Sequence, residues 1–107
     1  MIAFKVLLKQ IGGLDSATLE RWIEARWVLP ERASGTYLFH EVDVARVHLI
    51  TELTRDLMID EEALPVVLGL LDQVYALRKR LSSVARAIDR LPPDLQTTIH
   101  EKLKDDS

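Results

Sequence analysis

The residues of this chain with the clearest chemical potential are carboxylates that gather before a long apolar C-terminal stretch. Residues 51–66 hold five acidic side chains and one basic side chain, a net charge of −4. Three of these carboxylates, Asp60, Glu61 and Glu62, are consecutive. Carboxylates at this position can stabilise the N-terminal dipole of a following helix, and they can also contact a basic partner. The two roles do not exclude each other.

Catalytic chemistry has no support in the sequence. A hydrolase needs a nucleophile with a nearby base or two carboxylates across a cleft, and a phosphate site needs a glycine-rich loop. The chain has no cysteine, and His40, His48 and His100 are too scattered to predict a metal cluster. We therefore expect no enzyme activity, no metal and no cofactor.

Two short helices and a hairpin are predicted to precede residues 51–66. The first helix is expected over residues 4–11, and the second runs from an N-cap at Asp15 or Ser16 to about Arg26. A polar stretch ending at Gly35 then leads into strand-forming residues 36–39, which indicates a small hairpin or wing.

A third helix is predicted from about Glu41 to near Met58, because apolar residues recur there at helical spacing. Among the aromatic residues, we expect Trp22 and Phe39 in the core. Trp27 and Tyr37 are candidates for an exposed apolar patch on the wing.

The fourth and longest predicted helix carries a heptad seam. Asp60 is expected to cap it, and Pro92 ends it. An apolar seam of four heptads indicates dimerisation, although packing on the chain's own domain is the alternative. Arg78 and Arg80 flank the seam, which favours an antiparallel pair. The predicted dimer interface consists of Val67, Leu70, Val74, Leu77, Leu81, Val84, Ile88 and Leu91.

These elements predict a mainly α protein, a winged helix-turn-helix with a small β-hairpin wing and a long C-terminal dimerisation helix. Its expected parts are a winged-helix region over residues 1–59, the long helix over 60–91, and a short C-terminal helix and tail over 92–107.

The charge distribution does not favour nucleic-acid binding. A reading element normally presents a basic face to phosphate. Here residues 1–50 are neutral, and the basic excess lies over residues 67–91. Arg21 and Arg26 on the second helix can contact a phosphate backbone, or they can simply pair with neighbouring glutamates.

No segment predicts a membrane span or a targeting signal. The longest apolar run, residues 64–71, is far shorter than the roughly 20 residues that a spanning helix needs. Residues 1–13 contain two lysines and lack a small-residue cleavage site. We expect a cytoplasmic protein.

Residues 18–30 and 35–39 resemble the MerR-type winged-helix family. Arg21, Glu24, Pro30, Phe39 and Asp43 fall where that family has its arginine, glutamate, proline, wing aromatic and acidic helix start. The similarity spans about residues 5–60. It implies DNA binding as one function.

Two departures argue against that function. DNA-binding members of the family typically carry a phosphate-binding arginine before the wing aromatic, whereas this chain has Tyr37 and Leu38. Trp27 also replaces the family's usual glycine after the second helix, which adds bulk where the chain is expected to turn.

A closer resemblance is to the CbpM-type chaperone modulators, a MerR-like branch that binds the J-domain of a DnaJ/CbpA-like cochaperone. Residues 68–77, which lead into a basic leucine-bearing helix, carry the most telling match. The resemblance implies that this chain occupies the J-domain and inhibits the cochaperone. J-domains offer a basic helix, so the expected contacts are Glu52, Asp56, Asp60, Glu61, Glu62 and Asp72. The alternative is a MerR-family transcriptional regulator that uses Arg21 and Arg26 on DNA.

Overall fold

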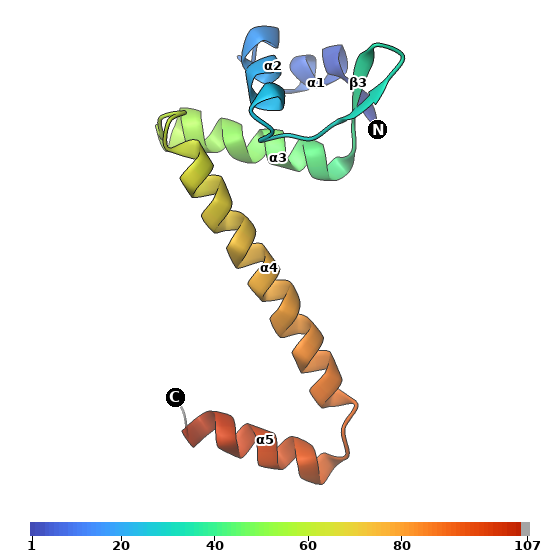
Figure 1. The fold of residues 1–107 in the computed structure, drawn as a ribbon, viewed down its shortest axis with the longest axis vertical. Coiled ribbons are helices and arrows are strands. Elements are labelled where there is room, and N and C mark those ends of the chain that lie inside the picture. Colours follow the sequence, from blue (N-terminus) through green and yellow to red (C-terminus); the bar gives the residue numbers. More distant parts are fainter. Residues whose placement is uncertain (106–107) are drawn as a thin grey trace. The chain divides into compact units, whose positions relative to one another are not determined.

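The computed structural model describes residues 1–105 and confirms the predicted fold class. These residues form a mainly helical winged helix-turn-helix followed by a long helix, and a small antiparallel sheet carries the wing (Figure 1). They divide into two compact units, Met1–Leu68 and a second unit that begins at Gly69.

The chain begins with a short strand that the sequence did not predict. Strand β1 (Ile2–Ala3) leads directly into helix α1 (Phe4–Gln10), and helix α2 (Ser16–Glu24) follows. Asp15 is the N-cap of α2, because its carboxylate accepts a hydrogen bond from the Thr18 backbone N–H at 2.8 Å. A strand of two residues shows no alternation that could be recognised in advance.

The wing is the predicted hairpin. Strands β2 (Glu31–Ala33) and β3 (Thr36–Phe39) are joined by Ser34 and Gly35, whose φ values of 53° and 77° fit the tight turns that hairpins prefer. Strand β1 pairs with the other edge of β3 and places Ile2 opposite Phe39. The hairpin is thereby attached to the N-terminus.

Helix α3 (Glu41–Thr51) continues into a single π-helical turn, Glu52–Asp56. After this turn the chain changes direction at Met58, which has a left-handed φ of 54°. The Ile59 backbone N–H then donates to the Leu53 carbonyl at 2.8 Å, and Ile59 packs against the core. Leu57, which continued the predicted helical spacing, is instead 66% exposed.

The core of the first unit collects one or two apolar side chains from nearly every element. Trp22 and Phe39 belong to it, as the sequence predicted. Trp27 and Tyr37 are partly buried and pack against it. The buried members are Leu7, Ile11, Leu14, Leu19, Trp22, Val28, Phe39, Val47, Ile50, Leu53, Leu64 and Leu68. Burial of these side chains is the main stabilising term of the unit.

Helix α4 (Leu64–Asp89) begins later than predicted. Residues 60–63 form a turn in which the Ala63 N–H donates to the Asp60 carbonyl, so Asp60 does not cap the helix. Pro65 lies in the first helical turn, where its missing N–H costs nothing. Leu64 and Leu68 are buried, which places this first part of α4 in the first unit.

The second unit contains the rest of α4 and helix α5 (Pro93–Asp105). Gln96 joins the two helices, because its side-chain amide donates to the carbonyls of Asp89 and Leu91 at 3.1 and 2.8 Å. Helix α4 ends before Leu91. Leu91 precedes Pro92, and a residue before a proline disfavours the helical conformation. The expected tail extends past residue 105, outside the described residues.

Across residues 1–105, no helix has both the length and the apolar character needed to cross a membrane.

Candidate functional site

Glu61 is the acidic residue with the most interactions in the predicted partner-binding segment. Its Oε1 atom accepts hydrogen bonds from Arg21 Nη2 and from Trp22 Nε1, both at 2.9 Å, and its Oε2 atom lies 3.2 Å from Arg21 Nη2. Arg21 and Trp22 belong to α2, whereas Glu61 lies in the turn before α4. Glu61 therefore attaches residues 52–62, which we call the acidic segment, to the second helix of the winged-helix region.

These bonds change the acidity of Glu61. The Trp22 indole N–H, followed by the Arg21 guanidinium, stabilises the carboxylate and lowers the pKa of Glu61 below its usual value of 4.5. Partial burial acts in the opposite direction and is the smaller effect. Glu61 is thus an internal acceptor, and any contact that it makes with a partner remains a prediction.

The neighbouring carboxylates are exposed. Glu52 and Asp56 lie on the π-helical turn, and Asp60 and Glu62 lie in the turn before α4. Within residues 1–105, these four side chains have no hydrogen bond or ion pair. Their charge is therefore available to a partner. Asp72, the sixth predicted contact, is exposed on α4 and belongs to the second unit.

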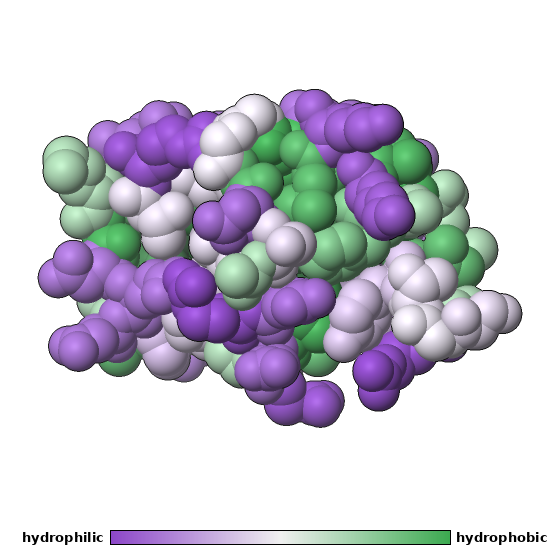
Figure 2. Space-filling view, turned by 90° about the horizontal axis from the view of Figure 1, so that it is seen from above, coloured by the Kyte–Doolittle hydropathy of each residue, from purple (hydrophilic) through white to green (hydrophobic). Residues whose placement is uncertain are grey.

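Two large apolar side chains lie among these carboxylates. Leu57 and Met58 are 66% and 80% exposed, since the chain turns here and Ile59 takes the core position. Figure 2 shows the same mixture more generally, with apolar side chains at the surface between hydrophilic ones. The sequence did not predict the exposure of these two residues, because helical spacing places Leu57 on the buried face.

The residues of the DNA-binding alternative lie at two places on or after α2. Arg21 is held by Glu61, which weakens its availability to phosphate. Arg26 is exposed and follows the helix with a φ of 65°. The Arg26 N–H donates to the Ile23 carbonyl, and the Trp27 N–H donates to the Trp22 carbonyl, so that Arg26 occupies the left-handed position of a Schellman motif.

This geometry corrects the expectation for Trp27. The residue that turns the chain is Arg26, one position earlier, and Trp27 has no left-handed φ. Trp27 instead packs partly against the core, and its carbonyl accepts a hydrogen bond from Arg46 Nε at 2.9 Å. Its bulk therefore contributes to packing and does not strain the turn.

The wing carries an arginine, Arg32, that was not among the residues predicted from the sequence to contact DNA or a partner. Arg32 on β2 pairs with Tyr37 on β3, and its guanidinium lies 5.3 Å from the centre of the Tyr37 ring. Phe4 packs on Tyr37 from α1, with ring centres 6.2 Å apart. A cross-strand position cannot be assigned from sequence until the hairpin register is known.

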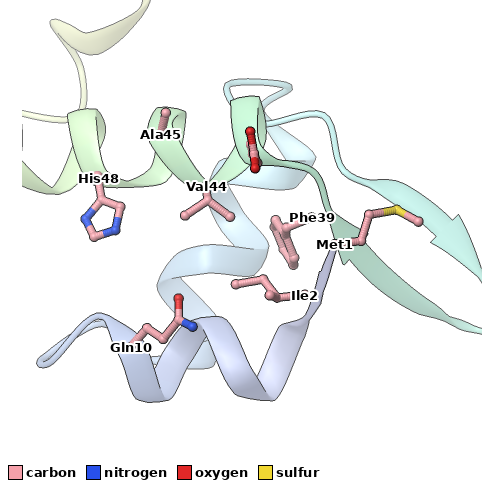
Figure 3. Close-up of a pocket in the computed structure, with 8 residues that line it drawn as sticks. Met1, Ile2, Gln10, Phe39, Val44, Ala45 and His48 are labelled. Atoms are coloured by element: carbon pink, nitrogen blue, oxygen red, sulfur yellow. The ribbon is translucent and has the colours of Figure 1, made fainter.

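One cleft lies between α3 and the N-terminal residues (Figure 3). It has a volume of about 370 Å³, and the side chains of Ile2, Phe39 and Val44 point toward it. Gln10, Glu41 and His48 supply its polar lining. No serine or threonine lines the cleft beside the histidine, so it offers no nucleophile and base pair. In the part of the chain that is described, no cluster of acidic or histidine side chains has the arrangement to hold a metal ion.

Most of the predicted dimer seam is exposed along α4. Leu70, Leu77, Leu81 and Val84 are each more than half exposed, and Val74 is 44% exposed. Ile88 and Leu91 are partly exposed. Val67 instead packs against the core of the first unit, so only the later part of the seam offers an extended surface. Contact with a second copy remains a prediction.

Comparison with known protein families identifies the family to which this fold belongs. The chain matches the family described as MerR HTH family regulatory protein over residues 4–86. This match covers most of the chain, and the protein therefore belongs to the MerR helix-turn-helix family. No match was found among curated proteins or among solved structures.

Proposed function

We propose that this MerR-family protein is a non-enzymatic chaperone modulator of the CbpM type. It binds the J-domain of a DnaJ/CbpA-like cochaperone and inhibits that cochaperone. We expect it to act in the cytoplasm. The proposal combines the sequence resemblance with one structural observation, which is that Glu61 engages Arg21 while the surrounding carboxylates stay exposed.

The ion pair between Arg21 and Glu61 bears directly on the choice of partner. In a winged helix-turn-helix, the second helix is the element that contacts DNA. Here Glu20 and Glu24 accompany Arg21 on α2, so the helix carries one arginine, already paired, and two glutamates. Such a helix would repel phosphate more than it attracts it.

The acidic segment has the features of a surface for a basic helix. Glu52, Asp56, Asp60 and Glu62 can meet lysine and arginine side chains, and they steer association with a positively charged partner. Leu57 and Met58 add apolar area, which charge alone does not supply. Exposed ion pairs contribute little each, so the affinity of the complex requires these apolar contacts.

We further propose that α4 joins two copies of the chain in an antiparallel pair. A second helix that covered the seam would remove its apolar surface from water. The exposed seam residues are Leu70, Val74, Leu77, Leu81 and Val84. Each fully buried leucine or valine contributes about 1.5–3 kcal/mol. The antiparallel arrangement separates the arginines that flank the seam.

Calorimetric titration with a J-domain tests the proposed function. We expect a saturable isotherm in low salt that weakens as salt is added, because exposed charges are screened. Absence of binding at high micromolar concentration in low salt would contradict the proposal. A cochaperone-dependent ATPase assay of its Hsp70-type partner then measures the inhibition.

Family membership itself favours one alternative, a MerR-family transcriptional regulator. Arg26 and Arg32 are exposed and both line the space between α2 and the wing. Retardation of promoter DNA at submicromolar protein, with a steep salt dependence, would support this alternative. Under the proposed function, only weak and nonspecific retardation is expected.

A further inference from the structure

A groove between the end of α2 and the wing is separate from the acidic segment. It has a volume of about 440 Å³ and lies within the first unit. The end of α2, the linker after it and both wing strands contribute to its lining. The lining residues are Ile23, Glu24, Arg26, Val28, Leu29, Pro30, Arg32 and Tyr37.

Most of the residues that line the groove are apolar. Leu29 is 61% exposed although it follows the fully buried Val28, so it presents an aliphatic side chain to any molecule in the groove. Pro30 and Tyr37 are partly buried and flank it. A surface of this kind gains free energy by covering an aliphatic or aromatic side chain of a partner.

Two cations also line the groove. The Arg32 guanidinium is held over the Tyr37 ring, and Arg26 is fixed at the end of α2 by the Schellman motif. Neither arginine has a carboxylate partner in residues 1–105. Glu31, the acidic neighbour of Arg32, is bonded to His40 Nε2 at 3.0 Å. The groove therefore has two cations against one anion, Glu24.

The composition of the groove distinguishes peptide from nucleic acid. A phosphate backbone would place strongly hydrated oxygens against the side chains of Leu29 and Pro30, which offer them no hydrogen bond. A peptide can place a carboxylate on each arginine and an apolar side chain against Leu29 and Tyr37. Guanidinium groups bind carboxylates well, since their planar donors match the two oxygens.

We propose that this groove binds a peptide segment of a partner protein that carries acidic side chains around an aliphatic or aromatic anchor. The anchor covers Leu29 and Tyr37, and the carboxylates pair with Arg26 and Arg32. This inference does not depend on the J-domain proposal, because the two surfaces suit different partners. The acidic segment is complementary to a basic helix, whereas the groove is complementary to an acidic peptide.

Fluorescence anisotropy with a labelled peptide tests the groove. The probe is a short peptide in which aspartate and glutamate flank one leucine and one phenylalanine. Two matched probes carry lysine in place of the acids or alanine in place of the apolar pair. We expect the first probe to bind with an affinity at least about fivefold higher than either matched probe, a difference of about 1 kcal/mol.

Substitutions then locate the binding. Arg32→Gln and Leu29→Ser should each weaken the first probe by about threefold or more, and both positions are exposed enough to leave the fold intact. Lys9→Gln, which removes one cation from α1 outside the groove, should have no effect. A nitrogen–proton correlation spectrum should show the largest shifts at Leu29 and Tyr37.

Three results would overturn the inference. They are no binding of the first probe, binding that is unchanged in Arg32→Gln and Leu29→Ser, and binding of duplex DNA that outcompetes the peptide and requires Arg32. The last result would make the groove a nucleic-acid surface. A J-domain that fails to bind would contradict only the proposed function, because the peptide experiment contains no J-domain.

Discussion

Arg21 Nη2 lies 2.9 Å from Glu61 Oε1, so that the second helix of the helix-turn-helix is bonded to the acidic segment that precedes α4. The two residues would serve rival functions, since an arginine on α2 suits DNA and a glutamate before α4 suits a basic partner. Their mutual contact reduces the availability of both. It leaves Glu52, Asp56, Asp60 and Glu62 as the exposed carboxylates of the acidic segment.

Removing the Glu61 carboxylate should destabilise the first unit. In Glu61→Ala the Trp22 indole N–H, on a side chain that is only 2% exposed, loses its acceptor. We expect a loss of about 1–3 kcal/mol in the free energy of unfolding, measured by urea denaturation. Glu61→Gln keeps an acceptor oxygen and should lose less. The matched control Glu62→Ala should change stability by less than about 0.5 kcal/mol. Equal effects at positions 61 and 62 would contradict the structural role of Glu61.

The same carboxylate predicts a pH dependence. The pKa of Glu61 is lower in the folded protein than in the unfolded chain, first because of the Trp22 hydrogen bond and then because of Arg21. The folded state therefore binds fewer protons near this pKa. The stabilisation is complete above the unfolded pKa of about 4.5 and disappears as pH falls through the folded pKa. The stability difference between wild type and Glu61→Gln should shrink on acidification below about pH 5. A difference that grows instead would reverse the assigned direction.

A glycine at the turn after α2 should stabilise the protein. Arg26 has a φ of 65°, a conformation that a side chain with a Cβ adopts at a cost. We expect Arg26→Gly to raise the free energy of unfolding by about 0.5–1 kcal/mol, after the extra freedom of glycine in the unfolded chain is counted. Trp27→Gly should be destabilising, because Trp27 packs against the core. Thermal unfolding of the two variants separates these positions, and the opposite order would show that the turn lies at Trp27.

Charge placed on the α4 seam should dissociate the proposed dimer. Leu77→Glu and Leu81→Glu introduce a carboxylate at positions that are already 56% and 67% exposed in a single chain, so the fold of the first unit should persist. Sedimentation equilibrium should then give the mass of one chain. Ala76→Glu adds the same charge off the seam and should leave the dimer intact. A wild-type protein that sediments as a monomer would show that α4 does not join two copies of the chain.

Local patterns were sufficient to predict most elements of the fold. Asp15 and the apolar spacing that follows it predicted α2, and Gly35 followed by residues 36–39 predicted the wing. Strand β1 was missed because two residues carry no periodicity. The sequence predicts too early a start for α4, because acidic residues often precede helices and Asp60 here lies in the turn before the helix.

The candidate site was predictable in charge but not in arrangement. The excess of carboxylates in residues 51–66 is a property of composition. The bond between Arg21 and Glu61 joins residues that are 40 positions apart, and no local pattern encodes it. Likewise, the π-helical turn and the left-handed Met58 expose Leu57, whereas regular helical spacing would have buried it.

We propose that the acidic segment, and not the α2–wing groove, binds the J-domain. Calorimetric titration of one J-domain into two charge variants tests it most directly. Asp56→Asn/Asp60→Asn/Glu62→Gln removes three exposed carboxylates, and Arg26→Gly/Arg32→Gln removes the two groove cations. We predict that the first variant loses about tenfold or more in affinity and the second binds like wild type. Unchanged affinity in the first variant, or loss confined to the second, would show that the J-domain does not bind at the acidic segment.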